Sequence, residues 1–589
     1  MASRATISTR SFYGIRRPPA NIISLPTADV SEASSEGSDE EAFDIESGED
    51  TTESSSESES DEEEVLDQAP SSSRVEEYEW LLKGKQTWKI PTKSKIDERK
   101  LKLNPDLEDS LSKNSSPIEF FNLFVTSELL DMILEQTQLY ATSLSINKSN
   151  AKEVDEITVE DIKKAFGIVL YMGILKLPNR RMYWQNNTRV EIIANTMGVN
   201  RFAKIMQLLH YNDNNLIPAS KSEDYNKCYK IQPLVDYIRE KFFEAVIPET
   251  YVAVDEQLVP FKGASCLKRY LPKKPKKWGY KLWAIAGVSG YVYTFEVDGE
   301  KGKTGLPDGW NAPEKCGESG FVVLRLIEKL EEDKHKLFFD NFFSSPELME
   351  YLARKGFWAL ATLNANRSRK CPLPSESELK KSGRGSSAQN VNRERSVIVT
   401  SWYDSRRVLM ISNFIGKEPV GECTRYIRKE KATASVERPA SVELYNNYMG
   451  GVDKTDMMLA LYRTKYRSRK WYQRIGLHLI SQCAVNAWII YKEMGGLKSY
   501  LDFLTEICVT LMVGKPQSDD SDEDQPEPPP PPKKRMKASN IPEAIRYDKY
   551  DHWPILLDMP NAHAEMQNGR LQEKNNVYVQ QVQCVLMCH

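Results

Sequence analysis

Residues 337–345, LFFDNFFSS, place a carboxylate, Asp340, in the middle of the chain's most apolar run. Burying an unpaired carboxylate costs several kcal/mol, roughly, so few folds accept this segment as it stands. The fold must neutralise Asp340, pair it, or direct it out of the core toward a cation. The short apolar run predicts a buried strand with Asp340 at its tip and the phenylalanines in the core.

Hydrophobic periodicity divides the rest of the chain into a helical part and a mixed part. Over 116–248 apolar residues recur every three or four positions, and Thr158 with Asp161 resembles a capping box. From residue 250 onward strands and helices alternate. The expected elements are strands at 250–261, 336–343 and 357–363, a hairpin over 280–299 that turns at Ser289 and Gly290, and helices at 319–333 and 345–356. This order predicts a mixed α/β sheet.

Charge is distributed very unevenly along the chain. Residues 31–67 contain 17 acids and no Lys or Arg. Because the whole chain carries −4, the remaining residues sum to +13. A second acidic run, 519–527, holds six more acids, so the segments between the two runs are basic. A basic body with acidic tails favours a polyanion partner, with nucleic acid first, although an ordinary solvated surface is the simpler interpretation.

The cysteines and the apolar runs exclude several protein classes. Nine cysteines are scattered without a CxxC pair, which argues against a disulfide framework and an intact zinc site. We find no apolar signal segment and no apolar run of 18 residues, and we expect no secretion and no membrane span. The basic cluster KKRMK at 533–537 follows a Pro-rich stretch and suits a nuclear import signal, so the expected location is the nucleus.

Acidic side chains at element ends could share a cation. Asp255 interrupts the first strand, Asp340 ends a later one, and Asp453 and Asp456 lie in GGVDKTD at the start of a helix. Carboxylates within a few ångströms repel one another unless a cation lies between them, and hard oxygen donors suit Mg²⁺ or Mn²⁺. Two such ions about 4 Å apart can activate water and stabilise the leaving oxygen of a phosphodiester.

Each aspartate also has a simpler interpretation. An aspartate at a strand end is commonly a turn residue, and Asp453 stands where a helix N-cap is expected. Glu256 follows Asp255 directly, so its side chain points to the other face of the strand, outside the site.

Two basic segments flank these acids and contain aromatic residues that could stack on unpaired bases. The residues we predict to bind DNA are Lys268, Arg269, Lys273, Lys274, Lys276, Lys277, Arg463, Arg467, Arg469, Lys470 and Trp471. Charge runs are more often solvated faces, but each run here lies within thirty residues of a candidate metal ligand.

Four motifs in order resemble the piggyBac transposases and their transposable-element-derived relatives. These motifs are VDEQLVPFKG, RYLPKKPKKWGYKLW, FFDNFFSSPEL and YMGGVDKTDMM followed by YRSRKWY, and the likeness covers about 117–500. The resemblance implies an RNase H-like catalytic core with a mixed five-stranded sheet and a triad of Asp255, Asp340 and Asp453. It assigns Asp456 a less certain role. It further implies a homodimer in the nucleus that uses two Mg²⁺ or Mn²⁺ ions to cut double-stranded DNA at transposon ends and to join it at TTAA.

The predicted domain organisation follows from these patterns and from the resemblance. The parts are a disordered acidic tail (1–115), a helical dimerisation and DNA-binding part (116–248), the catalytic core (249–364), an insertion with β-strands (365–439), the return helix with the third aspartate (440–459), a second helical part (460–515), a linker (516–545) and a degenerate remnant of a Cys-rich domain (546–589).

The sequence departs from the family pattern in two places. Asn364 stands where the resemblance implies a DNA-contacting Arg, while Arg367 keeps a basic position. The family ends in a Cys-rich zinc-binding cross-brace, but this C-terminus retains only His563, Cys584, Cys588 and His589. Because each zinc needs four ligands at tight spacing, we predict that the tail binds no zinc.

Two functions of different class therefore compete. The intact triad favours a piggyBac-like transposase, and the eroded tail favours a domesticated DNA- or chromatin-binding protein without transposition activity, whose acidic tails bind chromatin partners. A third hypothesis is an interaction protein with no DNA role. Nicking of hairpin or flanked-end DNA with Mg²⁺ distinguishes them.

Overall fold

The computed structural model describes residues 78–81, 96–108, 111–146, 157–272, 274–300, 305–427, 431–464 and 466–514, with short strands between 553 and 582. Its contacts separate two units, Met1–Pro516 and Gln517–His589. The predictions for the acidic run at 31–67, the linker, and His563, Cys584, Cys588 and His589 fall outside the described residues.

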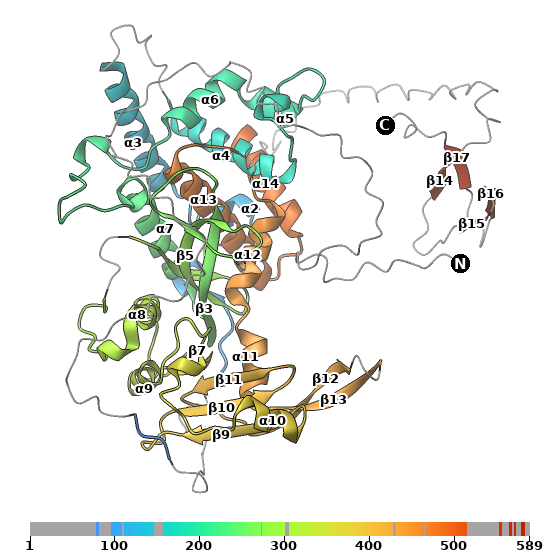
Figure 1. Cartoon of the computed structure of the whole chain (residues 1–589). Helices are drawn as coiled ribbons and strands as arrows, with labels where there is room; N and C mark the ends of the chain where they lie inside the picture. The colour runs from blue at the N-terminus through green and yellow to red at the C-terminus, as the bar shows by residue number, and fades with distance from the viewer. Residues whose placement is uncertain are drawn as a thin grey trace, which may run out of the picture. The chain divides into compact units, whose positions relative to one another are not determined.

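A nine-stranded mixed sheet forms the centre of the first unit (Figure 1). Its order is β4-β5-β3-β7-β8-β11-β10-β9, and β6 also pairs with β5. The strands are β3 (Tyr251–Pro260), β4 (Lys268–Tyr270), β5 (Trp278–Gly287), β6 (Val292–Val297), β7 (Lys336–Phe339), β8 (Trp358–Thr362), β9 (Ser387–Val391), β10 (Ile398–Tyr403) and β11 (Arg407–Ser412). β3, β7 and β8 run parallel, and the other pairs are antiparallel. The prediction of a mixed α/β sheet is confirmed.

The inserted strands extend the central sheet, which corrects the predicted separation of 365–439 from the core. β11 pairs antiparallel with β8 through Met410 and Thr362, and β10 and β9 follow outward. An edge strand such as β8 exposes unpaired backbone groups, and the insertion satisfies them. β12 (Gly421–Ile427) and β13 (Ala432–Arg438) form a separate two-stranded sheet.

Helices that precede the sheet strands in the sequence pack against helices that follow them (Figure 1). The principal helices are α2 (Pro117–Phe121), α3 (Ser127–Ile146), α4 (Val159–Ile174), α6 (Val199–Leu208), α7 (Gln232–Glu244), α13 (Trp471–Glu493) and α14 (Tyr500–Val513). Thr158 caps α4 through the predicted box with Asp161. α14 packs against α4 at Gly167, where an added Cβ would lie 2.9 Å from Met512. No helix in the described ranges is long and apolar enough to span a membrane.

Ordered structure begins before the predicted boundary at residue 115, so that boundary falls too late. β1 (Lys102–Leu103) pairs antiparallel with β2 (Val246–Ile247), and Leu103 is buried. Farther upstream, Thr250 donates its backbone N–H to the carbonyl of Arg99. The side chains of Leu101 and Leu103 are buried in the core. The acidic composition of residues 1–115 as a whole hides these few apolar residues.

The second unit contains four short strands among its described residues. β14 (Trp553–Leu556) pairs antiparallel with β17 (Val579–Val582), and β15 (Glu565–Gln567) pairs with β16 (Arg570–Gln572).

Glycine at 451 lets a helix approach the sheet closely. α12 (Gly451–Leu461) packs against β3 and β5, and a Cβ at Gly451 would lie 2.5 Å from the carbonyl oxygen of Gly287. This backbone contact has no flexible side chain that could move aside.

We therefore expect Gly451→Ala to displace the start of α12 and to lower stability by about 1–3 kcal/mol. Gly450→Ala is the matched control, because a Cβ there meets no atom within 4 Å and the cost at a helix N-cap is at most about 1 kcal/mol. Thermal unfolding of both variants checks this, and equal melting temperatures would contradict the close approach.

The N-terminal strand gives a second test. Leu103→Ala removes a side chain that is 5% exposed and should cost about 2–3 kcal/mol. Lys102→Ala, at the exposed neighbouring position, should change stability by less than about 0.5 kcal/mol. If both variants melt like the wild type, β1 contributes nothing to the folded unit.

Candidate acidic site at the ends of the central strands

The strand register brings Asp255 and Asp340 side by side. β3 and β7 are parallel, and their last paired residues are Val254 and Phe339. Asp255 and Asp340 each follow one position later, on neighbouring strands about 4.8 Å apart. Side chains alternate between faces, so both aspartates continue the face of Ala253 and Phe338. The predicted position of Asp340 at the tip of a buried strand is confirmed.

Two consecutive helices cover this face and carry the other acids (Figure 1). α11 (Ala440–Tyr448) packs on β3 and β8, and Tyr448 stacks on Tyr251 with ring centroids 3.8 Å apart. α12 follows directly and places Asp453 in its first turn and Asp456 one turn later. The N-cap of α12 is Gly450 and makes no side-chain capping bond, so the simpler interpretation of Asp453 as the N-cap is wrong.

The pKa of Asp255 reports the charges around it. Burial first, and then the charges of Asp453 and Asp340, raise this pKa to about 7. The backbone N–H of Glu256, which donates to Asp255 Oδ1 at 2.8 Å, and the Lys274 ammonium oppose this shift. Asp340 Oδ1 accepts a bond from the Phe342 N–H at 2.9 Å. The N–H donors and Lys274 thus compensate only part of the negative charge of the aspartates.

Asp456 extends the acidic group inward. Burial raises its pKa to about 6, against the favourable charge of Lys274 and a hydrogen bond from Gln257. Its Oδ1 atom is buried and has no hydrogen-bond partner. Arg463, which the sequence assigned to DNA, also stabilises this carboxylate. An unpartnered carboxylate oxygen is what a site for a cation leaves open.

Lys274 lies among the acids instead of on the basic surface where we predicted it. Its ammonium is 4.0 Å from Asp453 Oδ1 and donates to the carbonyl oxygen of Glu256 at 3.1 Å. The same charge lowers the pKa values of Asp255 and Asp456. Lys274 is therefore the counter-charge of the site, a role that a run of seven cations in the sequence could not distinguish.

Tyr445 is a residue of this site that sequence reasoning missed. Burial raises the pKa of its phenol, and the charges of Asp340, Asp255 and Asp453 raise it further. Tyr445 lies on α11, eight residues before Asp453. The sequence signal for Tyr445 in ELYNNYMGGVD was its spacing of three residues from Tyr448, because residues three apart lie on one side of a helix.

The donor chemistry of the site fits a hard divalent cation. Its four aspartates offer carboxylate oxygens, which Mg²⁺ and Mn²⁺ prefer. Among the residues that the structure describes, no three His, Cys, Asp or Glu side chains are already arranged to hold a metal ion.

The remaining predicted DNA contacts occupy different surroundings. Lys276, Lys277, Arg467 and Arg469 are exposed, and Lys273 lies outside the described residues. Arg269 forms an ion pair with Asp298 at 2.7 Å.

Three more of these predicted contacts are held by neighbouring groups. Lys268 lies over the ring of Trp278, Lys470 lies over Tyr140, and Trp471 packs near Tyr280. Arg367 donates to the carbonyl oxygen of Phe342 at 2.6 Å, which places it beside the turn after Asp340.

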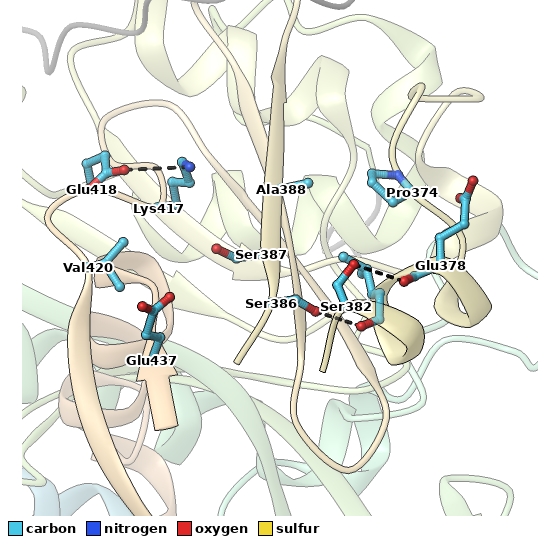
Figure 2. Close-up of a pocket in the computed structure, with 11 residues that line it drawn as sticks. Pro374, Glu378, Ser382, Ser386, Ser387, Ala388, Lys417, Glu418, Val420 and Glu437 are labelled. Carbon is cyan, nitrogen blue, oxygen red and sulfur yellow. Dashed lines mark hydrogen bonds and ion pairs between the residues drawn. The ribbon is translucent and has the colours of Figure 1, made fainter. Parts of the chain in front are cut away.

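A pocket of about 680 Å³ lies in the inserted part of the chain (Figure 2). Its lining residues come from 374–437 and include Glu378 of α10 (Glu376–Ser382) and the ion pair of Lys417 with Glu418. None of the four aspartates lines it, so this hollow is separate from the acidic site.

Comparisons with known proteins match most of the folded region. A family model described as Transposase IS4 matches residues 116–488. The human PiggyBac transposable element-derived protein 2 is 30% identical over 395 residues, which cover 66% of this chain and 64% of that protein. The human PiggyBac transposable element-derived protein 3 is 31% identical over 384 residues, which cover 64% and 61%. The chain thus spans a little under two thirds of the length of these relatives.

The fold also has a counterpart among solved structures. A cryo-EM structure of a piggyBac transposase synaptic complex with hairpin DNA superposes with a TM-score of 0.57 and 19% sequence identity. The match covers 70% of this chain and 83% of that chain. The mixed sheet with its helices is therefore a fold of that type.

The raised pKa of Asp255 predicts a pH-dependent effect of its neutral analogue. Between pH 4 and pH 7 the unfolded chain releases this proton before the folded chain does, so the wild type loses stability across that window. Asp255→Asn removes this loss and should be more stable by about 1–3 kcal/mol above pH 7, with no gain below about pH 4.

Thermal unfolding from pH 4 to pH 8 in EDTA measures this difference. Asp106→Asn is the control, because Asp106 is exposed and lies outside the site. A gain that is independent of pH, or a loss at pH 8, would contradict the desolvation of Asp255.

Proposed function

Because this chain belongs to the piggyBac transposase family, we propose that it is a DNA transposase, or a protein derived from one, that cleaves and transfers phosphodiester strands. The observation that carries this proposal is the register of β3 and β7, which sets Asp255 beside Asp340 under the helix of Asp453. Unlike a lone turn aspartate, Asp255 is buried beside other carboxylates, and burial together with the charges of Asp453 and Asp340 raises its pKa.

We assign β6, β5, β3, β7 and β8 as the RNase H-like core of the proposed enzyme. The parallel strands β3, β7 and β8 with the antiparallel hairpin β5–β6 support this assignment. The helical segments 116–248 and 460–515 are the proposed dimerisation and DNA-binding parts. Nuclear location and TTAA-directed joining of double-stranded DNA follow from the family as further proposals.

Asp255, Asp340 and Asp453, assisted by Asp456, would hold Mg²⁺ or Mn²⁺. Such ions, when bound, activate the attacking oxygen and stabilise the leaving oxygen of a phosphodiester. The chain itself supplies the positions of these carboxylates. Lys274 places a positive charge beside Asp453, and burial and the charges of the aspartates raise the pKa of the Tyr445 phenol.

Exposed cations around the site suit the phosphate backbone. Lys276, Lys277, Arg467 and Arg469 are positioned for contacts that neutralise phosphates, and such contacts dominate affinity for DNA. Arg367 stands beside the turn that holds Asp340. This surface gives the proposed enzyme its means of holding DNA across the acidic end of the sheet.

A DNA- or chromatin-binding protein without transposition activity is the second candidate. Lys274 favours it, because this ammonium already occupies the neighbourhood of Asp453 and opposes an added cation. Under this candidate the basic surface binds DNA and the acidic tails bind chromatin partners.

Cleavage of DNA tests the choice directly. We expect the wild type to nick hairpin or flanked-end DNA in Mg²⁺, and Asp340→Asn to reduce the rate by at least about 100-fold, because one carboxylate oxygen donor is lost. Asp106→Asn, at an exposed position outside the site and outside the proposed DNA-binding parts, is the control and should cut normally. Salt-sensitive binding without nicking by the wild type would support the second candidate, and absence of both would refute both.

Removal of the resident counter-charge should strengthen cation binding. We expect Lys274→Ala to bind Mn²⁺ several-fold more tightly than the wild type, because the ammonium no longer opposes a cation beside Asp453. Lys276→Ala, an exposed neighbour, should bind Mn²⁺ like the wild type. Titration calorimetry without DNA measures both, and equal affinities would contradict the role of Lys274.

A further inference from the structure

Phe342 differs from the other phenylalanines of its segment. Phe338, Phe339 and Phe343 are buried, as the sequence predicted for core residues, but Phe342 is 43% exposed. The interpretation of all four as core is therefore wrong for Phe342. A single exposed apolar side chain is common on protein surfaces, so the position of Phe342 beside the acidic site, and not its exposure alone, carries the argument.

The ring of Phe342 is held rigidly by two other aromatic rings. It stacks on Trp283 of β5 with centroids 5.1 Å apart and planes inclined by 21°. Phe343 meets it edge to face at 5.1 Å. Trp283 and Phe343 are themselves buried, so they fix Phe342 as the outer member of an aromatic stack. A fixed ring loses little conformational freedom when a second planar group stacks on it.

Two cations flank this aromatic stack. The Lys281 ammonium lies 3.7 Å from the centroid of Trp283 and 4.9 Å from that of Phe342, and it forms an ion pair with Glu256 at 3.3 Å. Arg367 donates to the backbone oxygen of Phe342 at 2.6 Å. An apolar ring between two cations suits a planar group that is attached to a negatively charged backbone.

Phe342 is also joined directly to the acidic site. Its backbone N–H donates to Asp340 Oδ1 at 2.9 Å, so the ring and this carboxylate belong to one turn. Trp283 is directly opposite Glu256 in the β3–β5 register, so the aromatic stack lies on the face of the sheet opposite to Asp255. Asp340 and Phe342 are only two residues apart, at most about 7 Å of chain, so a nucleotide next to a phosphate at Asp340 would reach the ring around the end of β7.

We propose that Phe342, supported by Trp283, is a stacking site for an unpaired nucleobase next to the phosphate at the acidic site. The inference rests on the proposed function and adds a ligand class, an unpaired base, that the duplex contacts above do not include. Stacking of this kind tolerates any base, because every base has a π-face. Loss of one such contact weakens binding by about 5- to 100-fold.

A forked DNA with 2-aminopurine in its single-stranded arm tests the proposal, with a fully paired duplex of the same sequence for comparison. Measurements in EDTA exclude cleavage. We expect wild-type protein to quench the 2-aminopurine fluorescence and to prefer the fork. Phe342→Leu, which keeps an apolar side chain without a π-face, should lose the quenching and at least about 5-fold of its affinity for the fork. Its affinity for the paired duplex should not change.

Two controls separate stacking from other effects. Phe342→Trp should restore quenching and fork binding, and Tyr426→Leu, which alters an exposed tyrosine of β12, should behave like the wild type. Equal fork binding by wild type and Phe342→Leu, with duplex binding intact, overturns the stacking site alone. Failure of the wild type to bind either DNA refutes the proposed function as well. A change in oligomeric state of Phe342→Leu without a change in quenching would assign the ring to an interface between copies and overturn the proposal.

Discussion

Two aspartates lie side by side where β7 ends against the middle of β3, and the proposed site depends on this arrangement. The register of β3 with β7 places Asp255 and Asp340 side by side. Burial is the main cause of the raised pKa of Asp255, which is about 7, and the charges of Asp453 and Asp340 contribute to it. Three further features surround these carboxylates. Lys274 supplies a counter-charge, backbone N–H groups donate hydrogen bonds to Asp255 and Asp340, and α12 packs on the sheet and contributes Asp453.

The close approach of α12 shows how backbone geometry creates the site. Gly451 is needed because a side chain would collide with the carbonyl oxygen of Gly287. α11 is fixed by the stack of Tyr448 on Tyr251, and the short connection between the two helices carries that position over to Asp453. The acidic group is therefore assembled from a strand, a strand end and a helix that lie far apart in the sequence.

Local patterns predicted the strands, the caps and the positions of the aspartates, because those features depend on neighbouring residues. The alternation of 250–261 gave β3, and Ser345 gave the start of α9 (Pro346–Arg354). Three features could not be predicted in this way. They are the contact of Lys274 with the acids, the exposure of Phe342 and the pairing of β11 with β8. Each depends on partners that are distant in the sequence. A run of cations or phenylalanines does not indicate which member faces the site.

The proposed function requires that a divalent cation binds among Asp255, Asp340 and Asp453. Anomalous diffraction from crystals of the protein soaked in Mn²⁺ measures this most directly, because it locates the ion without reference to any activity. We expect an anomalous peak between the carboxyl groups of Asp255, Asp340 and Asp453. We also expect the Lys274 ammonium to move away from Asp453. A structure without such a peak at saturating Mn²⁺, with Lys274 still beside Asp453, would contradict it.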